Sequence, residues 1–253
     1  MTTKMIEVER LALIGDVHLE DGDDALEPFC AMLGDVAARC DRLVLMGDLF
    51  NLWVGQEVMQ LSHHRRVVEA LRQVRRSGVA VDYVEGNRDY RIGKLFERDA
   101  FDHVWTDGVA YRVGDRSVWA IHGDLTNPND QQYRRWRRWS RGRLLWGLLN
   151  LIPQRSRQRV ADSLELRMRR TNQEFKREFP TEAVLRYGQR FLQAGCTDVV
   201  LGHFHIEREL ESSEPAGRVW VLPEWKGSRR HLEVDQDELR FVEEAGGGEE
   251  AGE

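Results

Sequence analysis

The sequence predicts an α/β fold whose later part is antiparallel, and three patterns along its 253 residues lead to this prediction. Short apolar runs rich in β-branched residues each end at a glycine or just before a polar island, which is typical of strands buried on both faces. Helical patterns separate the first three of these runs, and short alternating strands follow Gly202. A chain of this length is long enough to bury a full core as one domain.

The elements follow from these patterns in order. We expect buried strands at residues 11–14, 42–46, 79–84, 117–121 and 197–201, with helices at 25–39 and 61–77. Gly78 suits the C-terminal cap of the second helix, because glycine adopts the left-handed conformation freely. Later strands are expected at 206–211, 218–222, 231–234 and 238–242. In open α/β sheets, ligands bind at the carboxyl ends of the strands.

A segment at about 130–180 lacks the pattern of a strand, and we expect it to form two or three helices. These helices would form a cap inserted over the site. We therefore expect one domain over residues 1–242 that contains this cap, and a disordered acidic, glycine-rich tail at 243–253. The net charge of −6 conceals an asymmetry. Residues 134–177 carry fourteen Lys and Arg against three acids, or +11, whereas the remainder carries 23 basic and 40 acidic residues, or −17. Such a concentration of positive charge indicates an anionic partner.

Three widely spaced cysteines, Cys30, Cys40 and Cys196, favour buried reduced thiols over a disulfide framework. The first ten residues carry acids where a signal peptide has its apolar core. No run approaches the ~20 apolar residues that a membrane-spanning helix needs. We therefore expect a cytoplasmic protein.

Five polar islands follow the expected strands and supply the ligands of a two-metal hydrolase. Carboxylate, imidazole and amide groups suit a pair of borderline metals, which need oxygen and nitrogen donors and one shared carboxylate. Asp48 is the best candidate for the shared carboxylate, because it stands alone between the other islands. Residues two apart on an extended segment point the same way and can chelate one ion. The expected metal ligands are Asp16, His18, Asp48, Asn87, His122, His203 and His205.

This ordered set, Asp-x-His, Gly-Asp, Gly-Asn, His and Gly-His-x-His, resembles the calcineurin-like metallophosphoesterase superfamily. The resemblance implies a sandwich of two mixed β-sheets flanked by helices, with two divalent metal ions, manganese above all. It implies that the first metal is held by Asp16, His18 and His205, and the second by Asn87, His122 and His203, with Asp48 bridging. The complete ligand set argues against a catalytically inactive scaffold.

One residue narrows the resemblance. Most of the superfamily has a histidine after the asparagine of the Gly-Asn pair, whereas this chain has Arg88 after Asn87. Residues 86–93, 47–55 and 132–134 are similar to blocks of the UDP-2,3-diacylglucosamine hydrolases of lipid A biosynthesis. That resemblance implies hydrolysis of the pyrophosphate bond of UDP-2,3-diacylglucosamine to UMP and 2,3-diacylglucosamine 1-phosphate (lipid X). Asn51 and Gln56 depart from the subfamily pattern, which usually has acids there.

The resemblance and the residue chemistry together give the expected site. A planar, permanently charged Arg88 is a poor proton donor but a good bidentate clamp for a diphosphate. Asp124 is a candidate either to orient His122 by a hydrogen bond or to form a turn. The expected catalytic residues are Asp48, Asn87, Arg88 and His122. The expected substrate contacts are Arg88, Asp124, Trp136, Trp139, Leu144, Trp146, Arg167, Thr171, Lys176 and His203.

Residues 134–153 interleave tryptophans and leucines with arginines, which is typical of a helix in a membrane interface. Trp136, Trp139 and Trp146 recur at spacings that can share one helix face. We expect this segment to dock on the cytoplasmic face of the inner membrane or to bind the acyl chains of an acylated nucleotide sugar. An ordinary lid helix with a solvated basic face is the alternative. Another nucleotide-linked lipid or a nucleic-acid phosphodiester is the alternative substrate, and the apolar run 144–152 disfavours nucleic acid. The sequence leaves the acyl-chain length and the oligomeric state open.

Overall fold

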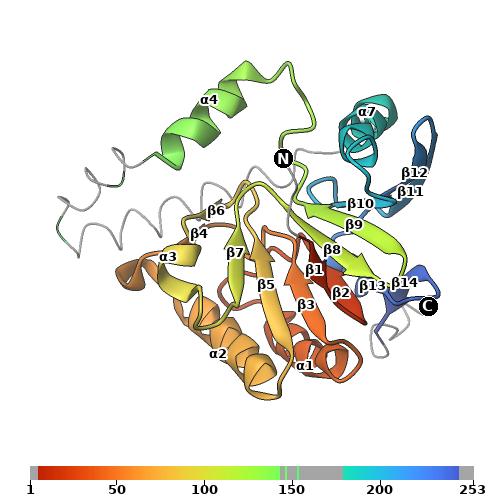
Figure 1. Ribbon diagram of the computed structural model, residues 1–253. Helices are drawn as coiled ribbons and strands as arrows, with labels where there is room; N and C mark the ends of the chain where they lie inside the picture. Colours follow the sequence, from red (N-terminus) through yellow and green to blue (C-terminus); the bar gives the residue numbers. More distant parts are fainter. Residues whose placement is uncertain (1–4, 143–145, 147–152, 154–178, 245–253) are drawn as a thin grey trace, which may run out of the picture.

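A computed structural model describes residues 5–142, 146, 153 and 179–244 of the chain. Two six-stranded sheets pack face to face, with helices on the outside (Figure 1). The strands are β1 (Ile6–Glu7), β2 (Leu11–Ile14), β3 (Arg42–Leu45), β4 (Trp53–Val54), β5 (Ala80–Val84), β6 (Asp89–Tyr90), β7 (His103–Trp105), β8 (Val109–Val113), β9 (Arg116–Ile121), β10 (Asp198–Leu201), β11 (Arg208–Ser213), β12 (Ala216–Val221), β13 (Arg230–Val234) and β14 (Leu239–Glu243).

Helices connect and cover these strands. The described helices are α1 (Leu26–Ala37), α2 (Ser62–Arg76), α3 (Gly93–Phe96), α4 (Gln131–Ser140), α7 (Thr181–Leu192) and α8 (Trp225–Ser228), with a 3₁₀ turn at Glu57–Met59. Sheet I has the order β14-β13-β2-β3-β5-β7, and sheet II has the order β1-β8-β9-β10-β12-β11. Strands β4 and β6 form a separate two-stranded parallel pair.

Alternation along the strands divides the core into layers. Leu11 and Leu13 of β2 face the apolar layer between the two sheets, whereas Ala12 and Ile14 face the layer under α1 and α2. This follows from the two-residue period of a strand, which sends successive side chains to opposite faces. A third apolar layer lies between α7 and the outer face of sheet II. The described residues therefore form a four-layer sandwich of helices, two sheets and a further helix.

Parallel register aligns the carboxyl ends of the strands that carry the polar islands. In sheet I, β2, β3 and β5 are parallel, and Ile14 pairs with Leu45. In sheet II, β9 and β10 are parallel, and Ile121 pairs with Leu201. The segments that follow these strands consequently leave the sandwich at one edge.

The predicted fold class is confirmed: two mixed sheets are flanked by helices. The expected antiparallel later part is also present, because β11–β12 and β13–β14 pair antiparallel. Helix α4 lies within the expected cap, whose other boundaries stay a prediction. Within the described part of the chain, no helix is both long and apolar enough to cross a bilayer.

Candidate metal centre

The seven predicted metal ligands all lie on segments that leave strand ends. Asp16 and His18 follow β2, and Asp48 follows β3. Asn87 follows β5, and His122 directly follows β9. His203 and His205 follow β10, as the sequence pattern predicts.

The backbone of this site is strained. Asp16, His18 and Asp48 each have φ of 52°, and His203 and His205 have φ of 74° and 58°. This left-handed region costs a non-glycine residue on the order of 1–3 kcal/mol, and such residues cluster at functional sites. The fold therefore holds five of the seven candidate ligands in a backbone conformation that costs energy.

One group of potential ligands is formed by Asp16, His18 and His205, whose donor atoms lie within 4.8 Å of one another. The Nε2 atoms of His18 and His205 are 3.1 Å apart. The Nε2 atom of His205 is 3.5 Å from Oδ1 of Asp16. The other oxygen of Asp16, Oδ2, accepts a hydrogen bond of 2.7 Å from the backbone N–H of His203, which fixes the carboxylate.

The second group centres on His122. Its Nδ1 donates to the carbonyl oxygen of Met46 at 2.8 Å, so the Nε2 of the neutral ring carries a lone pair. That Nε2 is 3.0 Å from Oδ1 of Asn87 and 3.7 Å from Oδ1 of Asp48. Oδ1 of Asn87 is also 2.9 Å from Nδ1 of His203. Lone pairs that converge in this way fit a cation placed between them.

The two groups adjoin each other. Asp16 also belongs to a group with Asp48 and His122, whose donor atoms again lie within 4.8 Å of one another. Oδ1 of Asp48 accepts a hydrogen bond of 2.8 Å from the backbone N–H of Arg88. The arrangement therefore fits two divalent metals: it offers carboxylate, imidazole and amide donors and no thiolate. The bridging role of Asp48 stays a prediction.

Burial and neighbouring charges set the protonation of these ligands. Burial lowers the pKa of His18 to about 3 and that of His203 to about 4, so both rings are neutral at pH 7 and can ligate a metal. Burial also lowers the pKa of His205, but the Asp16 carboxylate outweighs it and raises that pKa to about 9. Burial raises the pKa of Asp16, and His205 more than reverses this, so that the pKa falls well below its usual value.

Two glycines let the ligand-bearing loops approach one another. A Cβ on Gly86 would lie 2.2 Å from Oδ1 of Asp48 and 2.8 Å from Cε1 of His122. A Cβ on Gly47, which has φ of 84°, would lie 2.8 Å from Nδ1 of His122. The Gly-Asp and Gly-Asn pairs of the sequence therefore have a steric reason: only hydrogen fits beside the ligands.

Asp89 supports this loop geometry and was not predicted to do so. Its Oδ2 accepts hydrogen bonds from the backbone N–H groups of Asp48 at 3.0 Å and of Gly86 at 2.8 Å. Lys226 also escaped prediction: its Nζ donates to the carbonyl oxygen of His18 at 2.9 Å and pairs with Asp23. The sequence points to these two residues only through their neighbours: Asp89 stands two residues after Asn87, and Lys226 follows the buried Trp225.

Arg88 and Asp124 lie beside the centre. Arg88 is buried, and its backbone fixes Asp48. Asp124 does not receive the Nδ1 hydrogen bond of His122, which goes to Met46. Instead the Asp124 carboxylate accepts from the hydroxyl of Tyr133 and, at 2.8 Å, from Nε of Arg137. Asp124 thus ties the metal-ligand loop to α4.

The three tryptophans of residues 134–153 do not lie on one helix face, so that prediction is wrong. The side chains of Trp136 and Trp139 are 47% and 52% exposed, with ring centroids 5.3 Å apart. Trp146 is only 7% exposed and packs with Leu52, Val54 and Met59. Helix α4 ends at Ser140, so Trp146 is not on its face, and its Nε1 donates to the Ser140 carbonyl at 2.7 Å. The other expected cap contacts, Leu144, Arg167, Thr171 and Lys176, lie outside the described residues.

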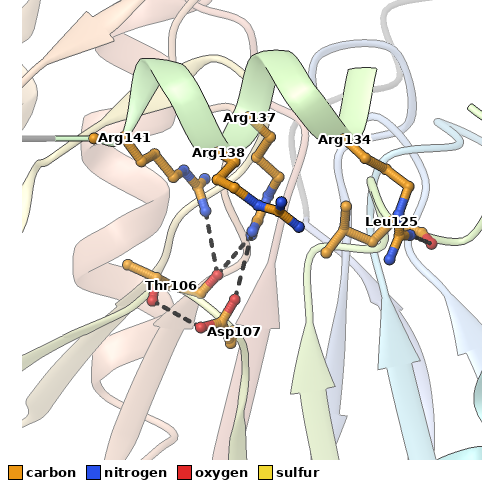
Figure 2. Close-up of a pocket in the computed structure, with 8 residues that line it drawn as sticks. Thr106, Asp107, Leu125, Arg134, Arg137, Arg138 and Arg141 are labelled. Carbon is orange, nitrogen blue, oxygen red and sulfur yellow. Dashed lines mark hydrogen bonds and ion pairs between the residues drawn. The ribbon is translucent and has the colours of Figure 1, made fainter. Parts of the chain in front are cut away.

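A cavity of about 470 Å³ lies under α4. Figure 2 shows arginine side chains that project from α4 toward Thr106 and Asp107, which follow β7. The concentration of basic charge in this segment was predicted, but not the role of these arginines. The missed signal is the spacing of the arginines at 134, 137, 138 and 141, which fall on one face of a helix.

Comparison with known proteins gives relatives over most of the chain. No family model matches it. A UDP-2,3-diacylglucosamine hydrolase of Pseudomonas paraeruginosa is 32% identical over 231 residues, which cover 88% of this chain and 93% of that protein. A protein of the same name from Ectopseudomonas mendocina is 31% identical over 233 residues and covers 89% and 94%. Among solved structures, Vacuolar Protein Sorting 29 of Cryptosporidium parvum has a TM-score of 0.48 at 16% identity, covering 95% of this chain and 94% of that one.

Proposed function

This chain belongs to the family of UDP-2,3-diacylglucosamine hydrolases, and on that premise we propose that it hydrolyses the pyrophosphate bond of UDP-2,3-diacylglucosamine. The products are UMP and 2,3-diacylglucosamine 1-phosphate. The observation that carries the proposal is the convergence of carboxylate, imidazole and amide donors from five strand ends at one edge of the sandwich.

Two divalent metals fit this donor set. Asp16, His18 and His205 would hold the first, and Asn87, His122 and His203 the second, with Asp48 between them. Bound there, the metals neutralise phosphoryl oxygens and lower the pKa of a water molecule so that hydroxide forms near neutral pH. Nitrogen and oxygen ligands without thiolate suit manganese, which we propose as the metal.

The chain's own residues orient the substrate. His122 donates from Nδ1 to the Met46 carbonyl, and this holds its Nε2 toward the centre. Arg88 lies buried next to Asn87, where a planar guanidinium binds diphosphate oxygens in two places at once. A permanently charged arginine protonates a leaving group poorly, which suits a substrate whose leaving group is a stable phosphate. Pyrophosphate cleavage therefore agrees with the residue at this position.

We also propose that α4 brings the protein to the cytoplasmic face of the inner membrane. Trp136 and Trp139 form an exposed aromatic pair on a helix that carries five arginines within Gln131–Ser140 and at its C-cap. Exposed tryptophans among cationic side chains suit an anionic lipid interface. An enzyme with an acylated, anionic substrate needs such a surface.

The experiment is hydrolysis of three substrates by the manganese-loaded protein, with the products identified by mass spectrometry. They are UDP-2,3-diacylglucosamine, deacylated UDP-glucosamine and a soluble aryl phosphodiester. We expect UMP and 2,3-diacylglucosamine 1-phosphate as products, at a higher kcat/KM than for either comparison substrate. Preference for the deacylated sugar would refute the lipid substrate. Cleavage of single-stranded RNA or DNA, with no hydrolysis of the nucleotide lipid, would assign a nuclease instead.

A further inference from the structure

The cavity under α4 is strongly basic. It lies between α4, the turn after β7 and the loop after β9 (Figure 2). Among the described residues that line it, Asp107 is the only acidic one. The lining residues are Thr106, Asp107, Leu125, Arg134, Arg137, Arg138, Arg141 and Gly142.

Two of the four arginines anchor the helix. Nε of Arg137 pairs with Asp124 at 2.8 Å, and its Nη1 lies 3.4 Å from Asp107. Nη2 of Arg137 donates to the carbonyl oxygen of Thr106 at 2.7 Å. Arg141 donates to the same carbonyl at 3.3 Å and lies 3.9 Å from Glu85. These contacts dock α4 and use most of the charge of both side chains.

The other two arginines have no carboxylate partner among the described residues. Arg134 makes one long hydrogen bond, of 3.4 Å, to the carbonyl oxygen of Leu125. Arg138 makes no hydrogen bond or ion pair to any part of the chain that the structure describes, and its guanidinium points into the cavity in Figure 2. Like charges around one cavity repel one another, and a bound anion relieves that repulsion.

The cavity adjoins the metal centre through two direct contacts. Nη2 of Arg141 donates at 2.9 Å to the carbonyl oxygen of Gly86, the residue before Asn87. Arg137 pairs with Asp124, which stands two residues after His122. The cavity therefore lies beside the loops that carry Asn87 and His122.

We propose that this cavity is an anion subsite, in which Arg134 and Arg138 bind the phosphate of the substrate that the metals do not hold. The inference rests on the proposed function, because a nucleotide-sugar diphosphate carries two phosphates and a two-metal centre holds one at the reacting bond. Guanidinium forks match phosphate oxygens in geometry and charge. The ligand chemistry is a phosphate monoester or diphosphate oxygen, and either the UMP side or the sugar 1-phosphate side supplies it.

The test compares the Arg134→Ala/Arg138→Ala double variant with Arg135→Ala. Arg135 is exposed on the same helix and is not among the residues that line the cavity, so it controls for lost charge. KM and kcat are measured on the manganese-loaded protein with UDP-2,3-diacylglucosamine and with an aryl phosphodiester, which has a single phosphate. We expect the double variant to lower the ratio of the two kcat/KM values about tenfold, mainly through KM for the diphosphate. Arg135→Ala should keep the native ratio.

Product inhibition identifies which phosphate occupies the subsite. UMP and glucosamine 1-phosphate are each tested as inhibitors of aryl phosphodiester hydrolysis by the native protein and the double variant. The inhibitor whose inhibition constant rises in the double variant is the one that the cavity binds. If neither constant rises, or if Arg135→Ala changes the ratio equally, the subsite is refuted. The native protein could also fail to hydrolyse the nucleotide lipid while the double variant loses product inhibition. That result would support the subsite and refute the proposed function.

Discussion

Replacing Gly86 by alanine tests how the loops assemble the centre. An added Cβ would lie 2.2 Å from Oδ1 of Asp48, whereas real Cβ atoms essentially never come within 3.0 Å of a neighbour. The carboxylate must therefore move by about 0.8 Å, and the Asp48 backbone nitrogen, 2.9 Å from the new atom, is also too close. Misplacement of a reacting group by about 1 Å costs on the order of 10²-fold in rate. The same overpacking costs about 1–3 kcal/mol of stability.

The assay is manganese-dependent hydrolysis of an aryl phosphodiester by Gly86→Ala, together with thermal unfolding. Gly34→Ala in α1 is the matched control, because a Cβ there meets nothing within 4 Å. We expect the control to keep its activity and to gain up to about 1 kcal/mol of stability, since alanine favours a helix over glycine. If Gly86→Ala stays as active as the control, close packing around Asp48 is not a requirement of the site.

Three further predictions follow from contacts elsewhere. If Arg88 clamps a diphosphate, Arg88→Lys and Arg88→Ala should both lose turnover roughly 10- to 100-fold, with the melting temperature unchanged. A Lys variant with native kinetics would mean that Arg88 forms a structural ion pair instead. Burial raises the pKa of Asp102, but hydrogen bonds from Arg75 and Val81 outweigh burial and lower that pKa below its usual value. The carboxylate therefore stabilises the fold fully at a pH well above its unfolded-state pKa of about 3.9, and this stabilisation is lost as the pH falls through the lowered value. Asp102→Asn should therefore lower the melting temperature at pH 7, and the difference should narrow below about pH 4; a constant difference would contradict this. Replacing both Trp136 and Trp139 by serine should weaken sedimentation with anionic phospholipid vesicles, since buried apolar area contributes ~25 cal/mol per Å²; native-like sedimentation would exclude docking by this pair.

The strands and the positions of the candidate metal ligands could be predicted because their signals are local. The run 11–14 is apolar on both faces because both faces are buried, and β2 coincides with it. Polar residues that follow such runs lie at the carboxyl ends of the strands, and the structure brings them together there. The β4–β6 pair escaped prediction because each strand has two residues, too few for any periodicity. Strand β8 was missed because Arg112 interrupts its short apolar run.

The surroundings of the centre could not be predicted, because they depend on contacts between distant segments. The arginine cavity exists because α4 docks on Thr106 through Arg137, thirty-one residues away in the chain. The shared face of three tryptophans assumed one continuous helix, but α4 ends at Ser140. Trp146 is then free to pack against Leu52, a partner that no local pattern reveals.

The central claim is that a two-metal centre built around Asp48 performs the hydrolysis. The most direct measurement is the number of manganese ions bound per folded chain, together with turnover of UDP-2,3-diacylglucosamine, for the native protein and for Asp48→Ala. We predict two ions per chain and rapid turnover for the native protein. The variant should fold, retain fewer than two ions and lose turnover by orders of magnitude. A near-normal rate for Asp48→Ala with manganese present would contradict the account.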